Sequence, residues 1–139
     1  MAEALGWLDT NVFVHAIIPG HKEYARCVQI IDALTDGRAA GWITPVVLHE
    51  LAYVLGRFPA YRSRAVVAAY LLDILDAPGV LTEDKPVLLA TVGRWMAGES
   101  LGFVDAHLAE LAARDGLPVC SANARDFPAT PHSYATAAI

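Results

Sequence analysis

The chain has 139 residues, of which 55% are hydrophobic and 18% are charged, and its net charge at pH 7 is −5. This length suits one domain of roughly 100–200 residues, so we expect a single domain over residues 1–139. The apolar composition excludes a disordered chain, and the acidic balance excludes a basic nucleic-acid-binding arm. No run approaches the ~18 apolar residues of a membrane-spanning helix, and the acidic start is unlike an export signal. We therefore expect a cytoplasmic protein that does not contact a membrane.

The apolar fraction exceeds the ~45–50% of an average globular domain. A small domain has much surface for its volume, so we expect part of this excess to lie at an interface. The helical segments 12–34 and 46–55 are the candidate surfaces, and a homodimer or a protein partner is the prediction. Cys27 and Cys120 belong to no metal-binding motif, so both are expected to be buried thiols rather than a disulfide or zinc site.

Short apolar strands alternate with helices along the chain. Strands are expected at 5–8, 41–44, 80–82 and 117–121, with a short edge strand around 133–135. Helices are expected at 12–18, 23–34, 45–55, 62–75, 86–96 and 104–114. This alternation predicts an α/β fold with a mainly parallel sheet covered by helices on both faces. In such a sheet, functional sites gather at the carboxyl ends of the strands.

Three aspartates fall where strands end or helices begin. Asp9 follows the first strand, Asp105 opens a helix, and Asp126 follows the last clear strand. Each has a structural alternative, since Asp9 and Asp105 would also suit helix N-caps and Asp126 would suit an ordinary loop. Together they predict an acidic site at one edge of the sheet.

Glu50 is expected on a helix face that it shares with Val46, Val47 and Val54. Because glutamate is rarely buried without a partner, an acid on an apolar face indicates a bound cation or a functional pocket. Crowded carboxylates repel one another unless a positive charge lies among them, and their hard oxygens suit Mg²⁺ or Mn²⁺. Such an ion lowers the pKa of bound water and neutralises charge on a phosphate. The residues therefore point to metal-assisted phosphodiester hydrolysis.

Four segments spread over almost the whole chain carry these acids. They are Leu8-Asp9-Thr10-Asn11-Val12, His49-Glu50-Leu51-Ala52, Phe103-Val104-Asp105-Ala106-His107-Leu108-Ala109 and Ser121-Ala122-Asn123-Ala124-Arg125-Asp126-Phe127. In this order they resemble the successive motifs of the PIN-domain family, and most closely those of the VapC-type toxins of bacterial toxin–antitoxin pairs.

The resemblance implies a PIN-like three-layer α/β/α sandwich. It also implies an Mg²⁺- or Mn²⁺-dependent endoribonuclease that acts as a toxin, forms a homodimer and is inhibited by a cognate antitoxin protein. Asp9 and Asp105 would be the principal metal ligands, and Glu50 and Asp126 would complete the acidic pocket. Asn123 stands where many relatives carry a further acid, so the number of metal ions stays open.

Other polar residues surround these acids in the sequence. Thr10, Asn11, Ser121 and Asn123 would hold a carboxylate or a metal-bound water, or else cap the neighbouring helices. An acidic chain needs local cations to bind RNA, and the candidates for phosphate contacts are Arg57, Arg62, Arg64 and Arg125. Glu110 and Asp115, late in their helix, are expected to be solvated.

Other acidic-site proteins fit the sequence less well. A phosphoacceptor receiver domain needs a lysine late in the chain, whereas the lysines here are Lys22 and Lys85. A haloacid-dehalogenase-type phosphatase needs a second acid at the position of Asn11. The main alternative is a catalytically inactive PIN-like module that acts by binding a partner protein.

Overall fold

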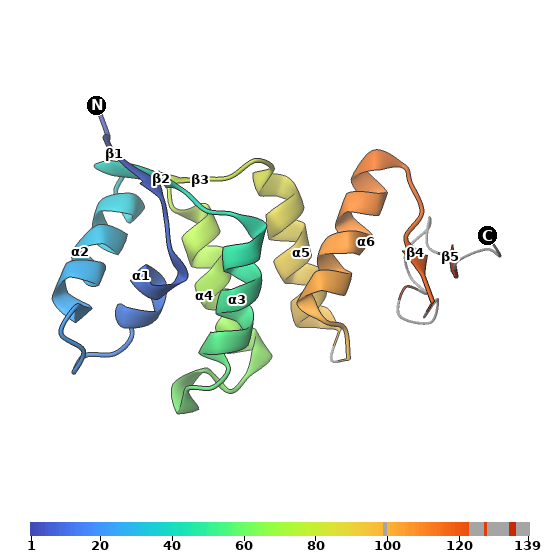
Figure 1. Ribbon diagram of the computed structural model, residues 1–139, viewed down its shortest axis with the longest axis horizontal. Helices are drawn as coiled ribbons and strands as arrows, with labels where there is room; N and C mark the ends of the chain where they lie inside the picture. Colours follow the sequence, from blue (N-terminus) through green and yellow to red (C-terminus); the bar gives the residue numbers. More distant parts are fainter. Residues whose placement is uncertain (99, 123–126, 128–133, 136–139) are drawn as a thin grey trace. The chain divides into compact units, whose positions relative to one another are not determined.

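The computed structural model describes residues 1–98, 100–122, 127 and 134–135. The chain divides into two compact units, Met1–Lys85 and Pro86–Ile139 (Figure 1).

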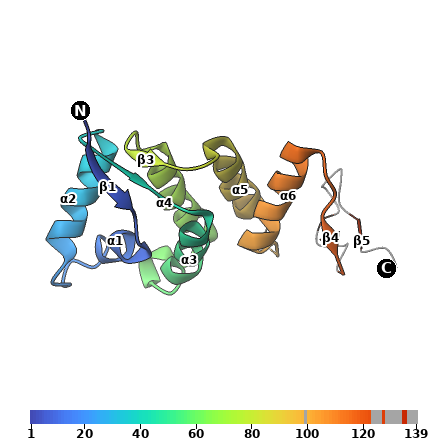
Figure 2. The same cartoon turned by 45° about the horizontal axis from the view of Figure 1, so that its top comes forward.

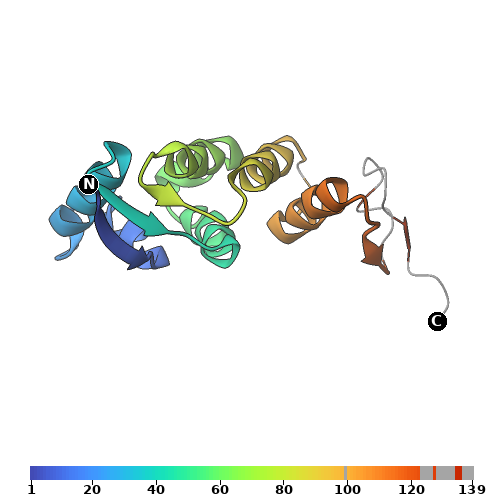
Figure 3. The same ribbon diagram turned by 90° about the horizontal axis from the view of Figure 1, so that it is seen from above.

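The first unit contains a parallel three-stranded sheet in the order β1-β2-β3, with helices flanking it (Figures 2 and 3). Its strands are β1 (Glu3–Trp7), β2 (Ala39–Trp42) and β3 (Val80–Leu81). Its helices are α1 (Thr10–His15), α2 (Tyr24–Thr35), α3 (Pro45–Leu55) and α4 (Arg64–Asp76), with a short 3₁₀ turn η1 (Pro59–Tyr61). The expected α/β fold with a parallel sheet is confirmed.

The strand register brings the three carboxyl ends to one level. Trp7 pairs with Trp42, and Trp42 pairs with Leu81. The ladder continues one residue further, because Leu8 N donates to Trp42 O at 2.8 Å and Ile43 N donates to Leu81 O at 2.9 Å. The residues that follow these strands therefore share one edge of the sheet.

The core of the first unit is built from the inward faces of the four helices and from the sheet. Its largest side chains with less than 2% exposure include Phe13, Leu34, Ile43, Leu48, Leu51, Leu55, Leu71 and Leu75. Burying an aliphatic or aromatic side chain of this size contributes about 1.5–3 kcal/mol, so this core fixes the positions of α1 and α3. These two helices carry Asp9 and Glu50.

The second unit contains α5 (Lys85–Ala97), whose first residue closes the first unit, α6 (Phe103–Asp115) and the parallel strand pair β4 (Cys120–Ser121) and β5 (Tyr134–Ala135). Trp95 and Phe103 pack edge to face between α5 and α6, with ring centroids 5.8 Å apart. Arg94 Nε and Glu110 Oε1 join the same two helices at 2.8 Å. Gly116 ends α6 in the left-handed conformation at φ 64°, which glycine adopts without strain.

Several expectations differ from the structure. The strand expected at 117–121 is reduced to Cys120–Ser121, and the helix expected at 12–18 ends at His15. Cys27 is buried and both thiols are free, but Cys120 is exposed, so its predicted burial was wrong. Successive side chains of an extended segment point to opposite sides, and here Val119 points inward, so Cys120 points to the solvent. Glu110 was expected to be solvated and is instead paired with Arg94.

Within the part of the chain that the structure describes, no helix combines the length and the apolarity that crossing a membrane requires.

Candidate functional site

The carboxyl edge of the sheet is formed by the residues that follow the three strands. Asp9 comes after β1, Thr44 after β2 and Glu83 after β3. Ligands of parallel α/β sheets bind at this edge, because loops and helix N-termini converge there. The edge is therefore the candidate site of the first unit.

Asp9 is exposed and occupies the N-cap position of α1, with extended backbone at φ −87° and ψ 151°. Its side chain nevertheless makes no capping hydrogen bond. The sequence left open that Asp9 caps this helix, but its carboxylate does not do so. The carboxylate stands at the edge of the sheet, where it is able to bind a ligand.

Glu50 lies in the middle of α3 and is exposed, so the prediction that it shares a buried apolar face was wrong. The buried residues of α3 are Leu48, Leu51, Ala52 and Leu55, which lie on the opposite side of the helix. Glu50 does share a face with Val46, as expected, but Val46 is 75% exposed. The acid therefore projects from a solvent-facing surface.

The exposed face of α3 continues from Glu50 to Tyr53, which lies three residues further along the same side of the helix. Arg57 follows just after α3 ends at Leu55. The Arg57 guanidinium lies 4.6 Å from the centroid of the Tyr53 ring, a cation–π contact that holds the arginine on this face. Arg62 is exposed and Arg64 is half-buried, and both lie between this helix and the first turn of α4.

Asp105 is half-buried and is the third residue of α6. Gly102 is the N-cap of that helix, so the N-cap interpretation of Asp105 was wrong. A Cβ at Gly102 would lie 3.4 Å from Asp105 Oδ2, so the carboxylate lies next to the main chain at the N-cap. A negative charge in the first turn also interacts favourably with the helix dipole.

The remaining predicted site residues are distributed over both units. Thr10 is buried at the start of α1, Asn11 is exposed, and Ser121 is half-buried in β4. Asn123, Arg125 and Asp126 lie outside the described residues. Burial, and to a smaller extent the charge of Arg114, lowers the pKa of His107 below its usual value of 6.5.

Asp9 and Glu50 belong to the first unit and Asp105 to the second. Among the described residues, no group of three or more His, Cys, Asp or Glu side chains is placed to hold a metal ion. The predicted donors are nevertheless all carboxylates, whose hard oxygens match the preference of Mg²⁺ and Mn²⁺. The chemistry of this donor set fits a divalent ion of that class.

Residues 7–132 match the family model of the PIN domain. The chain belongs to the PIN domain family. The match begins in β1 and covers the four segments that carry the acids, and PIN domains are typically metal-dependent nucleases. Among the curated proteins that were compared, none matches the chain. The family expected from the sequence is therefore confirmed, and its α/β fold agrees with the sheet of the first unit.

The sequence did not single out three further residues at the carboxyl edge of this PIN domain. Trp7, Trp42 and Glu83 help to line a cavity of about 360 Å³ there. The available signal was a tryptophan two residues before Asp9 and a second one two residues before the N-cap Thr44. Their proximity depends on the strand register, which the spacing of the residues along the chain does not show.

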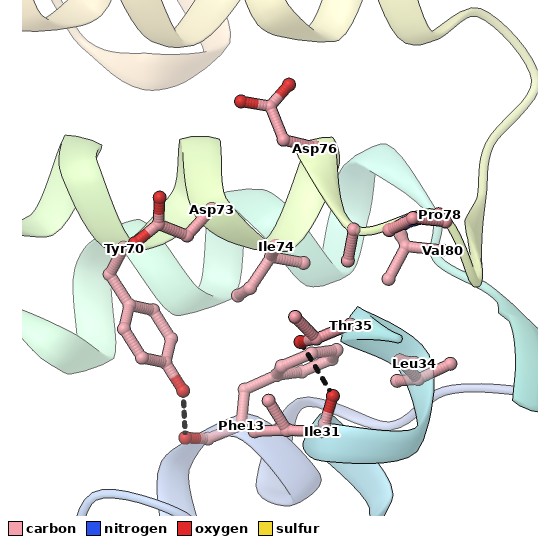
Figure 4. Close-up of a pocket in the computed structure, with 11 residues that line it drawn as sticks. Phe13, Ile31, Leu34, Thr35, Tyr70, Asp73, Ile74, Asp76, Pro78 and Val80 are labelled. Carbon is pink, nitrogen blue, oxygen red and sulfur yellow. Dashed lines mark hydrogen bonds between the residues drawn. The ribbon is translucent and has the colours of Figure 1, made fainter. Parts of the chain in front are cut away.

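A larger apolar cavity of about 550 Å³ lies among α1, α2, α4 and β3 (Figure 4). Phe13, Ile31 and Ile74 line its centre, and the Tyr70 hydroxyl donates to Phe13 O at 2.8 Å. Asp73 and Asp76 lie at its rim with their carboxylates turned away from the centre (Figure 4). This apolar lining is unsuited to phosphodiester chemistry.

Proposed function

We propose that this PIN domain is a metal-dependent endoribonuclease that acts as the toxin of a toxin–antitoxin pair. The observation that carries the proposal is Asp9, an exposed carboxylate at the carboxyl edge of the sheet that does not cap its helix. The order of the four acidic segments, which resembles that of the VapC-type toxins, supports the finer assignment. The substrate would be the phosphodiester backbone of RNA.

Asp9 and Asp105 would hold Mg²⁺ or Mn²⁺, with Glu50 and Asp126 completing the acidic pocket directly or through water. When bound, such an ion supplies a bound water of lowered pKa and neutralises charge that develops on the phosphate. Gly102 lies beside the Asp105 carboxylate, because a Cβ there would lie 3.4 Å from Asp105 Oδ2.

The residues around these acids would orient them. Thr10, Asn11, Ser121 and Asn123 each carry a hydroxyl or amide group that donates hydrogen bonds to carboxylates and to water. Thr10 is buried in the first turn of α1 directly after Asp9, which suits a positioning role. Its neighbour Asn11 is exposed and suits a contact with water or substrate.

RNA would run along the exposed face of α3, from Glu50 past Tyr53, and then reach Arg57 just beyond the end of the helix. Glu50 lies five residue steps before Leu55, the last residue of α3, which is roughly 8 Å of helix. Arg57 is already held over the Tyr53 ring, so little side-chain entropy is lost when it binds a phosphate. Arg62, Arg64 and Arg125 would add further phosphate contacts, which the net charge of −5 makes necessary.

The decisive experiment measures cleavage of single-stranded and structured RNA with Mg²⁺ or Mn²⁺ and with EDTA. Asp9→Asn, Asp105→Asn and Glu50→Gln each remove one negative charge at nearly constant volume, so metal binding and cleavage should both be lost. Growth inhibition by the expressed protein should disappear with them. The matched control is Asp115→Asn, which removes a charge from an exposed pair with Arg114 and should leave cleavage intact.

Cleavage that persists in EDTA or in an Asp9→Asn/Asp105→Asn double variant would overturn the metal mechanism. A chain that never cleaves RNA but binds a specific protein would instead establish the alternative, an inactive PIN-like binding module.

The antitoxin would be a protein with a basic amphipathic segment that fills the 550 Å³ cavity. The apolar lining suits the hydrophobic face of such a segment, and Asp73 and Asp76 at the rim suit its cations. A charge at the half-buried Ile31, introduced as Ile31→Asp, should abolish neutralisation by the antitoxin while RNA cleavage continues. The exposed Val66 lies outside this cavity, so Val66→Asp is the matched control. Neutralisation that survives Ile31→Asp would place the antitoxin elsewhere.

We also propose a homodimer, supported by the hydrophobic fraction of 55%, which exceeds that of an average globular domain. Light scattering should give twice the monomer mass at micromolar concentration. A monodisperse monomer under these conditions would overturn the homodimer.

A further inference from the structure

Two histidine rings stack face to face across the turn that joins α1 to α2. His15 is the last residue of α1, and His21 lies two residues before Glu23, the N-cap of α2. The ring centroids are 3.8 Å apart, and the ring planes are tilted by 17°. Both side chains are half-buried and both belong to the first unit. The stack is therefore a contact inside one compact unit.

Main-chain hydrogen bonds bring the two histidines together. Ile18 N donates to His15 O at 3.2 Å, and His21 N donates to Ile18 O at 2.9 Å. Tyr24 N then donates to His21 O at 3.0 Å. Each of these bonds closes a turn of the chain, because donor and acceptor are three residues apart. The stacked rings thus brace a succession of turns between the end of α1 and the start of α2.

The His21 ring also takes part in this segment through one of its nitrogens. Glu23 N donates a hydrogen bond to His21 Nδ1 at 3.0 Å. A ring nitrogen accepts a hydrogen bond only when it carries no proton, so this bond requires neutral His21 with its proton on Nε2. In the imidazolium both ring nitrogens are donors, and Nδ1 would then face the Glu23 N–H as a second donor. Protonation of His21 therefore breaks a bond that fixes the start of α2.

His15 adds a second reason for the turn to respond to acid. It lies in the last turn of α1, where a positive charge interacts favourably with the helix dipole. His15 can thus carry a proton while its ring stays stacked on neutral His21. A second proton, on His21, would place two positive charges on stacked rings, and like charges at this distance repel one another.

Other titratable or charged side chains lie on the turn and on the helices around it. The turn and the first residues of α2 carry Lys22, Glu23, Tyr24, Arg26 and Cys27. α3, which packs against α1, carries His49, Glu50 and Tyr53, and α4 contributes Tyr70, which is bonded to Phe13 O. Of these residue types, histidine is the one whose charge ordinarily changes between about pH 5 and pH 8. His49 is therefore the residue against which an effect of the stacked pair has to be compared.

We propose that His15 and His21 form an acid-sensitive latch between α1 and α2. The stack and the bond from Glu23 N close the latch while His21 is neutral, and proton uptake by His21 opens it. The open state binds more protons than the closed state, so acid favours opening. α1 begins directly after Asp9, and α2 lines the 550 Å³ cavity, so opening loosens the helices that form both. The latch goes beyond the proposed function, because it operates whether or not the chain cleaves RNA.

The test follows the whole protein by NMR from about pH 7.5 to about pH 5, the range in which histidine gains its proton. At the higher pH, the nitrogen chemical shifts of the His21 ring should show the tautomer with its proton on Nε2. Hydrogen-exchange protection of the Glu23 amide, corrected for the intrinsic effect of pH on exchange, should fall about tenfold across this range. The amide of the buried Leu51 in α3 should keep its protection.

Variants separate the latch from general sensitivity to acid. His21→Asn supplies a carbonyl oxygen that accepts the same hydrogen bond from two residues further on and does not titrate, so protection of Glu23 should stay constant. His15→Phe keeps a ring for the stack without a second charge, so protection should fall less than in the wild type. The matched control His49→Asn removes an exposed histidine from α3 and should behave like the wild type.

A His21 ring with its proton on Nδ1 at neutral pH would overturn the latch, because it could not accept the bond from Glu23 N. Constant protection of Glu23 in the wild type would overturn it as well. An equal fall in His21→Asn and in the wild type would show that another group responds to the acid. An equal fall in His15→Phe would remove His15 from the latch. If His21→Asn does not fold, the tautomer and the protection in the wild type still decide.

Discussion

Asp9 and Thr44 occupy equivalent positions at the ends of adjacent paired strands, yet only Thr44 caps the helix that follows it. Each lies two residues beyond a register partner, Trp7 or Trp42, and each has the extended backbone of an N-cap. Thr44 Oγ1 accepts a hydrogen bond from Val47 N at 3.2 Å, whereas the Asp9 side chain makes no such bond. The same position thus caps a helix after one strand, whereas after the neighbouring strand it holds a carboxylate that makes no capping bond.

This contrast predicts opposite effects of alanine at the two positions. Thr44→Ala should lower the free energy of unfolding by about 1 kcal/mol, because it removes a cap bond. Asp9→Ala should cost less than half as much while abolishing RNA cleavage. Urea unfolding in EDTA measures the stability of both variants. An equal loss of stability in the two variants would identify Asp9 as a structural cap.

The sequence predicted well the features that depend on residues close together in the chain. The helix Pro45–Leu55 has the expected boundaries, since Thr44 caps it and Pro45 occupies its first turn, and both signals lie within the segment itself. The family was predictable because Asp9, Glu50 and Asp105 stand in short motifs that keep their order along the chain.

Features that depend on contacts between distant residues were not predictable in the same way. The exposure of Glu50 depends on which face of α3 packs against other helices, and four apolar residues on the opposite face take that role. The Arg94–Glu110 pair joins residues 16 positions apart on two helices. The stacking of Trp7 and Trp42 similarly needs a strand register that hydrophobic periodicity does not provide.

The hydrogen bond from Tyr70 to the Phe13 carbonyl ties α4 to α1, the helix that begins after Asp9. Tyr70→Phe should lower the free energy of unfolding by about 0.5–1.5 kcal/mol, because the Phe13 carbonyl loses this donor. Burial, with smaller contributions from Tyr61 and Cys27, raises the pKa of Tyr70 above its usual value of 10. The folded state therefore holds the phenol proton more tightly than the unfolded state does, and this stabilisation is complete below pH 10 and is lost above it.

Urea unfolding from about pH 8 to about pH 11 tests whether the stabilisation by Tyr70 falls as the pH rises. The stability difference between the wild type and Tyr70→Phe should be constant up to about pH 10 and should shrink above it. A difference that grows with alkaline pH would contradict the assignment.

The Arg94–Glu110 pair should contribute more to stability than a surface pair does. Its side chains are only 27% and 18% exposed, and its atoms are 2.8 Å apart. A double-mutant cycle with Arg94→Met and Glu110→Gln should give a coupling of about 1 kcal/mol. The matched cycle at the exposed Arg114–Asp115 pair should give no measurable coupling. Equal coupling in the two cycles would show that burial adds nothing here.

Gly79 lies where the end of α2 meets the sheet, and the chain has no room for a side chain there. Gly79 N donates to Leu34 O at 2.8 Å, and Gly79 O accepts from Gly41 N at 2.8 Å. A Cβ at this position would overlap Ala39 O and would lie 2.8 Å from Leu34 O, both main-chain atoms that cannot rotate away. Relief of this overlap has to shift the backbone and break one or both of these hydrogen bonds.

Gly79→Ala should therefore lower the free energy of unfolding by about 3 kcal/mol, the sum of overpacking and of buried main-chain groups left unpaired. Gly56→Ala is the control in the same unit, because its Cβ would meet only ordinary contacts at 3.7 and 3.8 Å. Gly93, inside α5, has open space around its Cβ position, so Gly93→Ala should raise stability by about 0.5–1 kcal/mol through helix propensity. Urea unfolding of the three variants should thus give a large loss, little change and a gain. A Gly79→Ala variant as stable as Gly56→Ala would show that α2 and β3 do not meet as closely as the hydrogen bonds at Gly79 require.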